Sequence, residues 1–325
     1  MSSAKGPRGP GGSSSGKGGK PRAQGRPGSA RQGVGKGGRG GPARRGSGGG
    51  PGNRGGQRGT TPRGNRSGSS GQSKSPQKGL GGDQVEGRQA VRELLLAGKR
   101  RVREVVLAGD LDPAPILDDI IDLADEAKVT LREVSRNRFE NLARTDAPQG
   151  VVALAQPLKE YEFEDLLAPD ATGSDPFLLL LDGVTDPGNL GAILRSAECA
   201  GVTGVVLPRH RAAGVTATVA KSAAGAIEHL RMTRVAGLPK ALGRLSSAGV
   251  WSVGLDAGGE MAIHRLSVAD QPVALVMGAE GTGLSRLVRE RCDATAHIPL
   301  VGVLGSLNVS AAAAVALFEV ARHRT

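Results

Sequence analysis

The sequence has few aromatic residues and few cysteines. Its 325 residues include one Trp, one Tyr, four Phe and two Cys. The two cysteines, Cys199 and Cys292, lie far apart and lack the CxxC spacing of zinc or redox sites. We therefore expect reduced thiols in a cytoplasmic protein, without a disulfide framework. Because no cluster of Cys, His and Asp has the spacing of metal ligands, we expect no metal site.

Long apolar runs are also missing, as are acidic residues near the N-terminus. No stretch of about 18 apolar residues occurs, so no membrane span is expected. Residues 1–80 contain no Asp or Glu but hold 17 of the 43 Lys and Arg residues. The other 26 basic and 31 acidic residues give the rest of the chain a net charge of −5. The net charge of +12 therefore comes from the N-terminal region.

Residues 1–82 consist mainly of Gly, Ser, Pro, Arg and Lys and have almost no large apolar side chains. Such a segment cannot bury enough surface to offset the entropy lost on ordering, so we predict a disordered basic tail. Its cations suit contacts with RNA phosphates through counterion release. The alternative is a solubilising extension without a specific partner. The apolar core of a secretory signal is missing from this segment.

Residues 83–156 have the pattern of a small α/β domain. Helical spacing covers 85–97 and 116–128, and strand-like runs cover 103–107, 130–134 and 150–155. Basic residues gather between Lys99 and Arg103, which indicates either a surface for nucleic acid or ordinary solvated charge. Residues 157–175 are acidic and contain two prolines, and we interpret them as a linker.

Residues 176–325 alternate strand and helix patterns, which predicts a mainly parallel sheet with helices on both faces. The expected strands are 177–181, 202–207, 229–235, 250–255, 273–277 and 296–300. The expected helices begin near Asn189, Thr216, Pro239 and Val309. Asn189 stands where the N-cap of the first of these helices belongs.

Three loops in this second domain combine glycines with a few polar side chains. One follows the strand at 177–181, one spans 278–283 and one spans 301–310. Ligands of open α/β sheets bind at the carboxyl ends of the strands, where such loops meet. Glycines there let backbone N–H and C=O groups approach a ligand closely. The side chains include no strong nucleophile, which favours binding and positioning over covalent catalysis.

Three motifs of the second domain resemble those of the SpoU, or TrmH-type, ribose 2′-O-methyltransferases of the SPOUT superfamily. They are Asp186-Pro-Gly-Asn-Leu-Gly-Ala-Ile-Leu-Arg-Ser-Ala, Met277-Gly-Ala-Glu-Gly-Thr-Gly-Leu and Ile298-Pro-Leu-Val-Gly-Val-Leu-Gly-Ser-Leu-Asn-Val-Ser-Ala-Ala. All three stand in the order and spacing of that family. The preceding small domain looks like the substrate-binding domain of the RlmB-like branch.

The resemblance implies a SPOUT domain whose C-terminal part forms a trefoil knot, one of the rare knotted folds. It also implies a pocket for S-adenosylmethionine, lined by backbone at Gly278, Ile298 and Leu307. Periodicity alone would suggest a Rossmann-like methyltransferase instead. Against that alternative, no GxGxxG follows the first strand with an acidic residue about 20 positions later.

The resemblance further implies six catalytic positions. Asn189 and Asn308 would orient the ribose, Glu280 would hold a neighbouring group, and Arg195 would act as base or hold the nucleotide. Ser306 and Ser310 would contact the nucleotide or fix the loop. Each residue also has a purely structural interpretation: Asn189 and Ser310 as helix caps, Glu280 as a helix-entry carboxylate and Arg195 as surface charge.

From these observations we expect an S-adenosylmethionine-dependent RNA ribose 2′-O-methyltransferase that acts on large-subunit ribosomal RNA. Two alternatives are transfer RNA as the substrate, and a non-catalytic RNA-binding or ribosome-assembly factor. The polar set at Asn189, Arg195, Glu280 and Asn308 argues against the non-catalytic alternative. The resemblance also implies a homodimer, for which the Ala-rich helix after Val309 could supply the interface.

Overall fold

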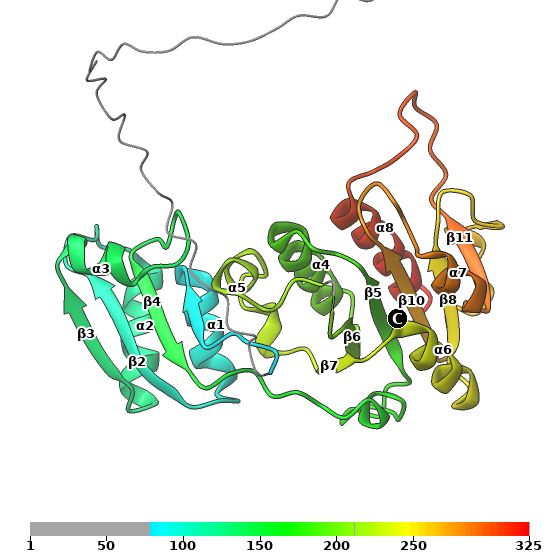
Figure 1. The fold of residues 1–325 in the computed structure, drawn as a ribbon. Coiled ribbons are helices and arrows are strands. Elements are labelled where there is room, and N and C mark those ends of the chain that lie inside the picture. Colours follow the sequence, from blue (N-terminus) through cyan, green and yellow to red (C-terminus); the bar gives the residue numbers. More distant parts are fainter. Residues whose placement is uncertain (1–78, 211, 325) are drawn as a thin grey trace, which may run out of the picture. The chain divides into compact units, whose positions relative to one another are not determined.

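The computed structural model of the protein describes residues 79–210 and 212–324 (Figure 1). The predicted basic tail therefore lies, up to residue 78, outside the described residues. The described part contains one sheet of four strands and one of seven. The seven-stranded sheet is parallel throughout, which confirms the predicted α/β class with a mainly parallel sheet.

The first sheet belongs to the small domain and has the strand order β1-β4-β2-β3. Strand β4 runs antiparallel to both of its neighbours, whereas β2 and β3 are parallel. Its elements are β1 (Gln84–Glu86), α1 (Arg88–Ala97), β2 (Val102–Ala108), α2 (Pro115–Glu126), β3 (Thr130–Val134), α3 (Arg136–Leu142) and β4 (Val151–Ala155).

The first helix begins later than its sequence pattern predicted. Helical spacing pointed to a helix from Val85, but Val85 lies in β1 opposite Ala153 of β4. All three residues of β1 are buried. Pairing with β4 buries this short segment completely. This burial outweighs the helical periodicity of the segment, so it forms a strand.

The second sheet has the strand order β7-β6-β5-β10-β8-β11-β9. Its strands are β5 (Phe177–Asp182), β6 (Gly204–Pro208), β7 (Met232–Val235), β8 (Trp251–Leu255), β9 (Met261–Ala262), β10 (Val273–Gly278) and β11 (Ala294–His297). The chain fills one side of β5 with β6 and β7, then crosses to the other side. Strands β5 and β10 therefore lie where the direction of winding reverses, and loops at their carboxyl ends can receive a ligand.

Strand β5 is buried on both faces, as expected for a central parallel strand. Phe177, Leu179 and Leu181 pack with α4 (Pro187–Cys199), α5 (Ala217–Ser222) and α8 (Val309–Ala321). Leu178 and Leu180 face the opposite layer, with α6 (Leu238–Ser247) and α7 (Arg286–Arg291). Among the described residues, no helix combines the length and apolar character needed to cross a membrane.

The segment predicted as a linker, residues 157–175, packs against the second domain. Phe163 and Leu166 are buried in the layer that contains α6. The Tyr161 backbone N–H donates to the Met232 carbonyl at 2.9 Å, next to β7. Leu166 lies in the short 3₁₀ helix η1 (Glu164–Leu166). The exact domain bounds stay a prediction.

The small domain and the second domain share a buried contact. The Gly82 N–H donates to the Val215 carbonyl at 2.8 Å, and Leu80 beside it is buried. Gly225, which precedes the 3₁₀ helix η2 (Ala226–Glu228), has φ 90°, and a Cβ there would overlap the side chain of Glu93 on α1. Only glycine fits this close approach without strain.

Candidate active site

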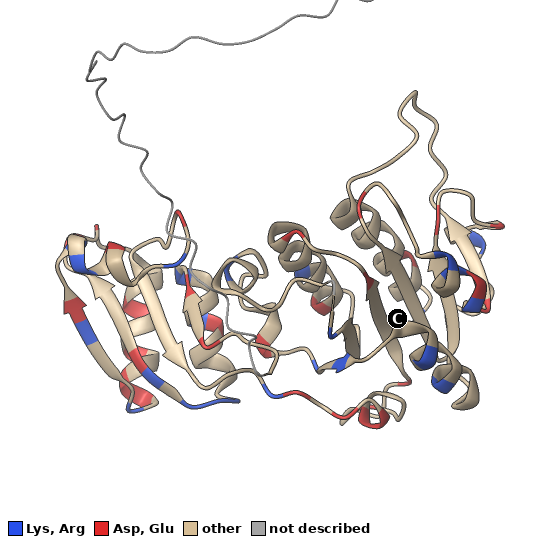
Figure 2. Ribbon diagram, in the orientation of Figure 1, with Lys and Arg blue, Asp and Glu red and all other residues tan. Residues whose placement is uncertain are grey.

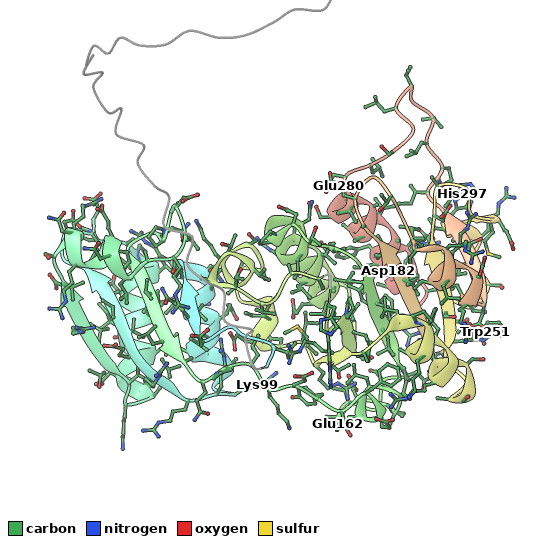
Figure 3. All side chains as sticks on the ribbon, in the orientation of Figure 1. Lys99, Glu162, Asp182, Trp251, Glu280 and His297 are labelled. Carbon is green, nitrogen blue, oxygen red and sulfur yellow. The ribbon has the colours of Figure 1, made fainter. Side chains whose placement is uncertain are left out.

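The site is built where β5 and β10 end side by side. Asp182, the last residue of β5, lies opposite Gly278, the last residue of β10. Asp182, labelled in Figure 3, accepts a hydrogen bond at Oδ2 from the Ser285 N–H at 2.7 Å, which fixes the loop that follows β10. A Cβ at Gly278 would overlap the backbone of Gly283 and Leu284. The loop therefore folds back tightly on the end of its own strand.

Helix α4 begins at the carboxyl end of β5 and is capped by Asp186. The Asp186 carboxylate accepts from the Asn189 N–H at 2.7 Å, and Pro187 occupies the first helical position. The prediction that Asn189 is the N-cap was therefore wrong. An Asp followed by Pro supplies both an acceptor and a pre-set φ, so the N-cap lies three residues earlier than predicted. The Asn189 side chain is left available for other contacts.

Asn189 connects the other two loops of the site. Its amide nitrogen donates to Glu280 Oε2 at 3.0 Å, and its amide oxygen accepts from Asn308 Nδ2 at 3.0 Å. The three residues come from α4, the loop after β10 and the start of α8. A single hydrogen-bonded chain therefore holds together segments that are 91 and 119 residues apart.

Asn308 is the N-cap of α8 as well as a partner of Asn189. Its Oδ1 accepts from the Ser310 N–H at 2.9 Å, the Ser310 hydroxyl at 2.6 Å and the Ala311 N–H at 3.3 Å. Saturating the oxygen in this way orients the amide, so Nδ2 is aimed at Asn189. Ser310 therefore serves as a hydrogen-bond donor to Asn308. The N-cap of α8 is Asn308 rather than Ser310.

Arg195 and Ser306 make no hydrogen bond to Asn189, Glu280 or Asn308 in the described structure. Arg195 follows Asn189 by six residues on α4, which is roughly 9 Å along the helix axis. Its side chain is exposed and forms no ion pair with any described residue, so its guanidinium can receive an anionic ligand. Ser306 is exposed and its hydroxyl makes no hydrogen bond within residues 79–210 and 212–324.

Two of the three positions expected to hold the cofactor, Gly278 and Leu307, lie within two residues of Glu280 and Asn308 in the sequence. Gly278 ends β10, Ile298 follows β11, and Leu307 directly precedes Asn308. Ile298 is half-buried, and Leu307 is exposed, as are Val301, Val303 and Leu304 in the same loop. Close backbone at Gly278 and exposed apolar side chains fit a ligand with both polar edges and apolar surface. The trefoil knot stays a prediction.

Sequence reasoning missed two carboxylates that shape the site. Asp182 fixes the loop after β10, and Asp186 caps α4. The Asp-Pro pair at 186–187 was the signal for the cap, whereas nothing local marks Asp182 as the partner of a loop 103 residues away. No group of three or more His, Cys, Asp or Glu side chains within the described ranges is placed to hold a metal ion.

Comparison with known proteins finds a matching family model for each of the two domains. Residues 176–318 match the model of the SpoU rRNA Methylase family, and residues 84–161 match that of the RNA 2′-O ribose methyltransferase substrate binding domain. A putative TrmH family tRNA/rRNA methyltransferase of Staphylococcus haemolyticus is 38% identical over 243 residues. The match covers 74% of this chain and 95% of that protein.

Two further proteins share most of the described chain. The 23S rRNA (guanosine-2′-O-)-methyltransferase RlmB of Photorhabdus laumondii is 43% identical over 197 residues, 61% of this chain and 80% of that protein. The SpoU methyltransferase AviRb of Streptomyces viridochromogenes, solved in complex with AdoMet, superposes with a TM-score of 0.60 at 26% identity. That match covers 74% of this chain and 89% of AviRb. The chain therefore belongs to the SpoU family of RNA 2′-O-ribose methyltransferases.

Proposed function

We propose that this protein transfers a methyl group from S-adenosylmethionine to a ribose 2′-hydroxyl of large-subunit ribosomal RNA. The observation that carries the proposal is the hydrogen-bonded chain Glu280–Asn189–Asn308, which joins three loops at the carboxyl ends of β5 and β10. Relatives named as 23S rRNA (guanosine-2′-O-)-methyltransferases, 43% and 40% identical, support the choice of RNA.

Residues at two loops would hold the cofactor, which supplies an electrophilic methyl group when bound. Backbone groups at Gly278 and Ile298 would meet its polar edges, and Leu307 would cover its apolar surface. The similarity to AviRb, whose structure contains AdoMet, supports this assignment. The exposed apolar side chains of the loop at 301–307 are the surface that such a ligand would cover.

The hydrogen-bonded residues Glu280, Asn189 and Asn308 would align the attacking ribose hydroxyl. A ribose hydroxyl is a poor nucleophile until its proton is accepted. Glu280 Oε2 is occupied by Asn189, so its other oxygen, Oε1, is left to accept the hydroxyl hydrogen. Arg195 stays protonated under ordinary conditions, and we assign it to holding a phosphate of the target nucleotide. Ser306 would contact the nucleotide from the same loop as Leu307.

We also propose that the protein acts as a homodimer in the cytoplasm, where ribosomal RNA is found. Helix α8 has an apolar outer surface, with Val315 46% and Phe318 50% exposed. A second copy of the chain would cover both side chains and bring a second small domain to the same RNA.

The test is transfer of labelled methyl from S-adenosylmethionine to unmodified ribosomal and transfer RNA pools. Three proteins are compared: the wild type, Asn308→Asp and Asn141→Ala. Asn308→Asp keeps the oxygen that caps α8 but removes the donor to Asn189. Asn141→Ala is a matched control, because among the described residues the Asn141 side chain bonds only to the Asn137 carbonyl in its own helix.

We expect transfer to large-subunit RNA by the wild type and by Asn141→Ala, and its loss in Asn308→Asp. Methylation of transfer RNA alone would identify transfer RNA as the substrate in place of ribosomal RNA. The name of the Staphylococcus haemolyticus relative includes both classes. No transfer to either pool would favour a non-catalytic RNA-binding factor.

A further inference from the structure

Four cations gather where the chain enters β2 and β3 of the small domain. Lys99, Arg101, Arg103 and Lys128 are all exposed, and none forms an ion pair with a described residue. In Figure 2 the segment that leads into β2 is blue, and Figure 3 labels Lys99 there. Cations left without partners in this way are available to an anionic ligand.

Three of these cations line a hollow, which we call the basic hollow. Arg101, Arg103 and Lys128 surround a space of about 440 Å³. The other lining residues are Leu94, Leu95, Gly98, Arg100, Val102, Ala127, Val129 and Thr130, so no carboxylate lines it. The hollow therefore combines positive charge with an apolar floor and lacks an internal counter-ion.

The path of the polypeptide brings the three cations together. Arg101 directly precedes β2 and Arg103 is the second residue of β2, while Lys128 lies between α2 and β3, the strand that pairs with β2. All three residues line the same hollow, so their side chains can contact one anionic backbone.

Lys128 occupies a turn position that usually favours glycine. Its φ is 53°, in the left-handed region, directly after the C-cap of α2. Glycine is the usual residue at this position because it has no Cβ to strain. The sequence instead places a long cation there, at the rim of the basic hollow.

The rest of the small domain has the opposite charge. Helix α2 exposes Asp118, Asp119, Asp122, Asp125 and Glu126. A larger groove of about 980 Å³ lies at the other end of β2. Its charged lining residues are Arg88 and Arg136 against Asp110, Asp112, Glu140 and Asp146. Both surfaces carry more carboxylates than cations, so the basic hollow suits a polyanion better than either of them.

The loop that carries the cations is fixed to the methyltransferase domain by Arg100. Its guanidinium donates to both Glu228 oxygens, at 2.8 and 2.6 Å, and to the Gln156 carbonyl at 2.7 Å. The side chains of Arg100 and Glu228 are 7% and 1% exposed. Because this pair is buried and doubly bonded, the loop and its exposed cations are held against the second domain.

We propose that the basic hollow binds the phosphodiester backbone of the substrate RNA, away from the nucleotide that is methylated. The proposal rests on the function proposed above, because it takes RNA as the ligand. Contacts to phosphates carry no sequence information, so this surface would set register and affinity while the active site selects the ribose.

The test uses the full chain with the triple variant Arg101→Ala/Arg103→Ala/Lys128→Ala. Its affinity for unmodified large-subunit RNA transcript is measured at several salt concentrations, together with KM and kcat for methyl transfer. The matched control is Arg138→Ala/Lys240→Ala/Arg291→Ala, which removes three exposed cations from three separate helices, none of them in an ion pair with a described residue. A conservative version, Arg101→Lys/Arg103→Lys, keeps the charge, and circular dichroism checks that each variant folds.

Each lost phosphate contact should weaken binding about fivefold at 0.15 M salt and lower the slope of log K against log salt by about 0.9. The triple variant should therefore bind about 100-fold more weakly, with the slope reduced by roughly 2 to 3. KM for RNA should rise in parallel while kcat is kept. The conservative version should bind like the wild type.

Two results would overturn the proposal: an unchanged slope and KM in the triple variant, or an equal loss in the scattered control. Either would leave methyl transfer by the wild type intact, so the proposed function would stand. Conversely, a wild type that binds RNA through the basic hollow but transfers no methyl group would refute the proposed function and leave this proposal standing.

Discussion

Removing the carboxylate of Glu228 should destabilise the protein strongly. Glu228→Ala leaves the Arg100 guanidinium buried with its two best hydrogen bonds lost. Breaking a buried ion pair in this way typically costs about 3–5 kcal/mol. For a protein of this size, the midpoint of thermal unfolding should then fall by roughly 6 to 20 °C.

An exposed ion pair of equal length provides the control. Arg322 and Glu319 also approach to 2.6 Å, but their side chains are 62% and 22% exposed, against 7% and 1% for Arg100 and Glu228. Glu319→Ala should cost less than about 1 kcal/mol, because solvent screens the pair. The two ion pairs therefore differ in burial, and also in that Arg100 donates two hydrogen bonds to Glu228 whereas Arg322 donates one to Glu319.

Urea unfolding followed by two probes measures both effects. Trp251, the single tryptophan, lies on β8 and reports the methyltransferase domain, whereas circular dichroism reports both domains. The two transitions should coincide in the wild type and separate in Glu228→Ala, because this pair joins the domains. Replacing both partners, with Arg100→Met and Glu228→Leu, should recover part of the loss. A Glu228→Ala variant no less stable than Glu319→Ala would refute the argument from burial.

Three further predictions concern the active site and the cysteines. Asn189→Ala should lower kcat for methyl transfer on the order of 100-fold through lost alignment, with little change in the unfolding midpoint. Gly278→Ala should cost about 1–3 kcal/mol in urea unfolding, because its methyl group overlaps backbone that cannot move aside; an unchanged midpoint would show that the loop gives way. Burial raises the pKa of the Cys292 thiol to about 12, so between pH 7 and 9 maleimide should label exposed Cys199 first and Cys292 only after unfolding. Rapid labelling of both thiols in the folded protein would contradict this.

Regular patterns in the sequence predicted most of the methyltransferase domain. Continuous apolar runs located β5 and β10, because strands buried on both faces carry no polar alternation. The expected last strand, 296–300, ends instead at His297, because Ile298 already begins the loop. The start of α4 was also misplaced, since Asp186 and Asn189 are both good caps and only the structure shows which oxygen accepts.

Long-range contacts could not be read from the sequence. Nothing near Arg100 indicates a partner 128 residues away, and both side chains would ordinarily be placed in solvent. The same holds for the contact of Asn189 with Glu280. The family resemblance grouped these two residues by role, whereas the sheet order, with β10 beside β5, brings their loops together. The roles assigned to Arg195 and Ser306 stay predictions.

The charge of the chain raises a question about how it attracts RNA at all. Residues 81–325 have a net charge of −5, and the substrate is a polyanion. At physiological salt, exposed charges act over about 8 Å, so Asp118 in the first turn of α2 is screened from phosphates at the entry of β2, whereas Asp125 and Glu126 directly precede the segment that lines the basic hollow. Local placement of cations then matters more than their total number. The 17 cations of residues 1–80 would add attraction to RNA, whereas the basic hollow, held by Arg100, would supply register. A chain shortened to residues 81–325 should associate with RNA more slowly, and the triple variant of the basic hollow should show the higher KM described above.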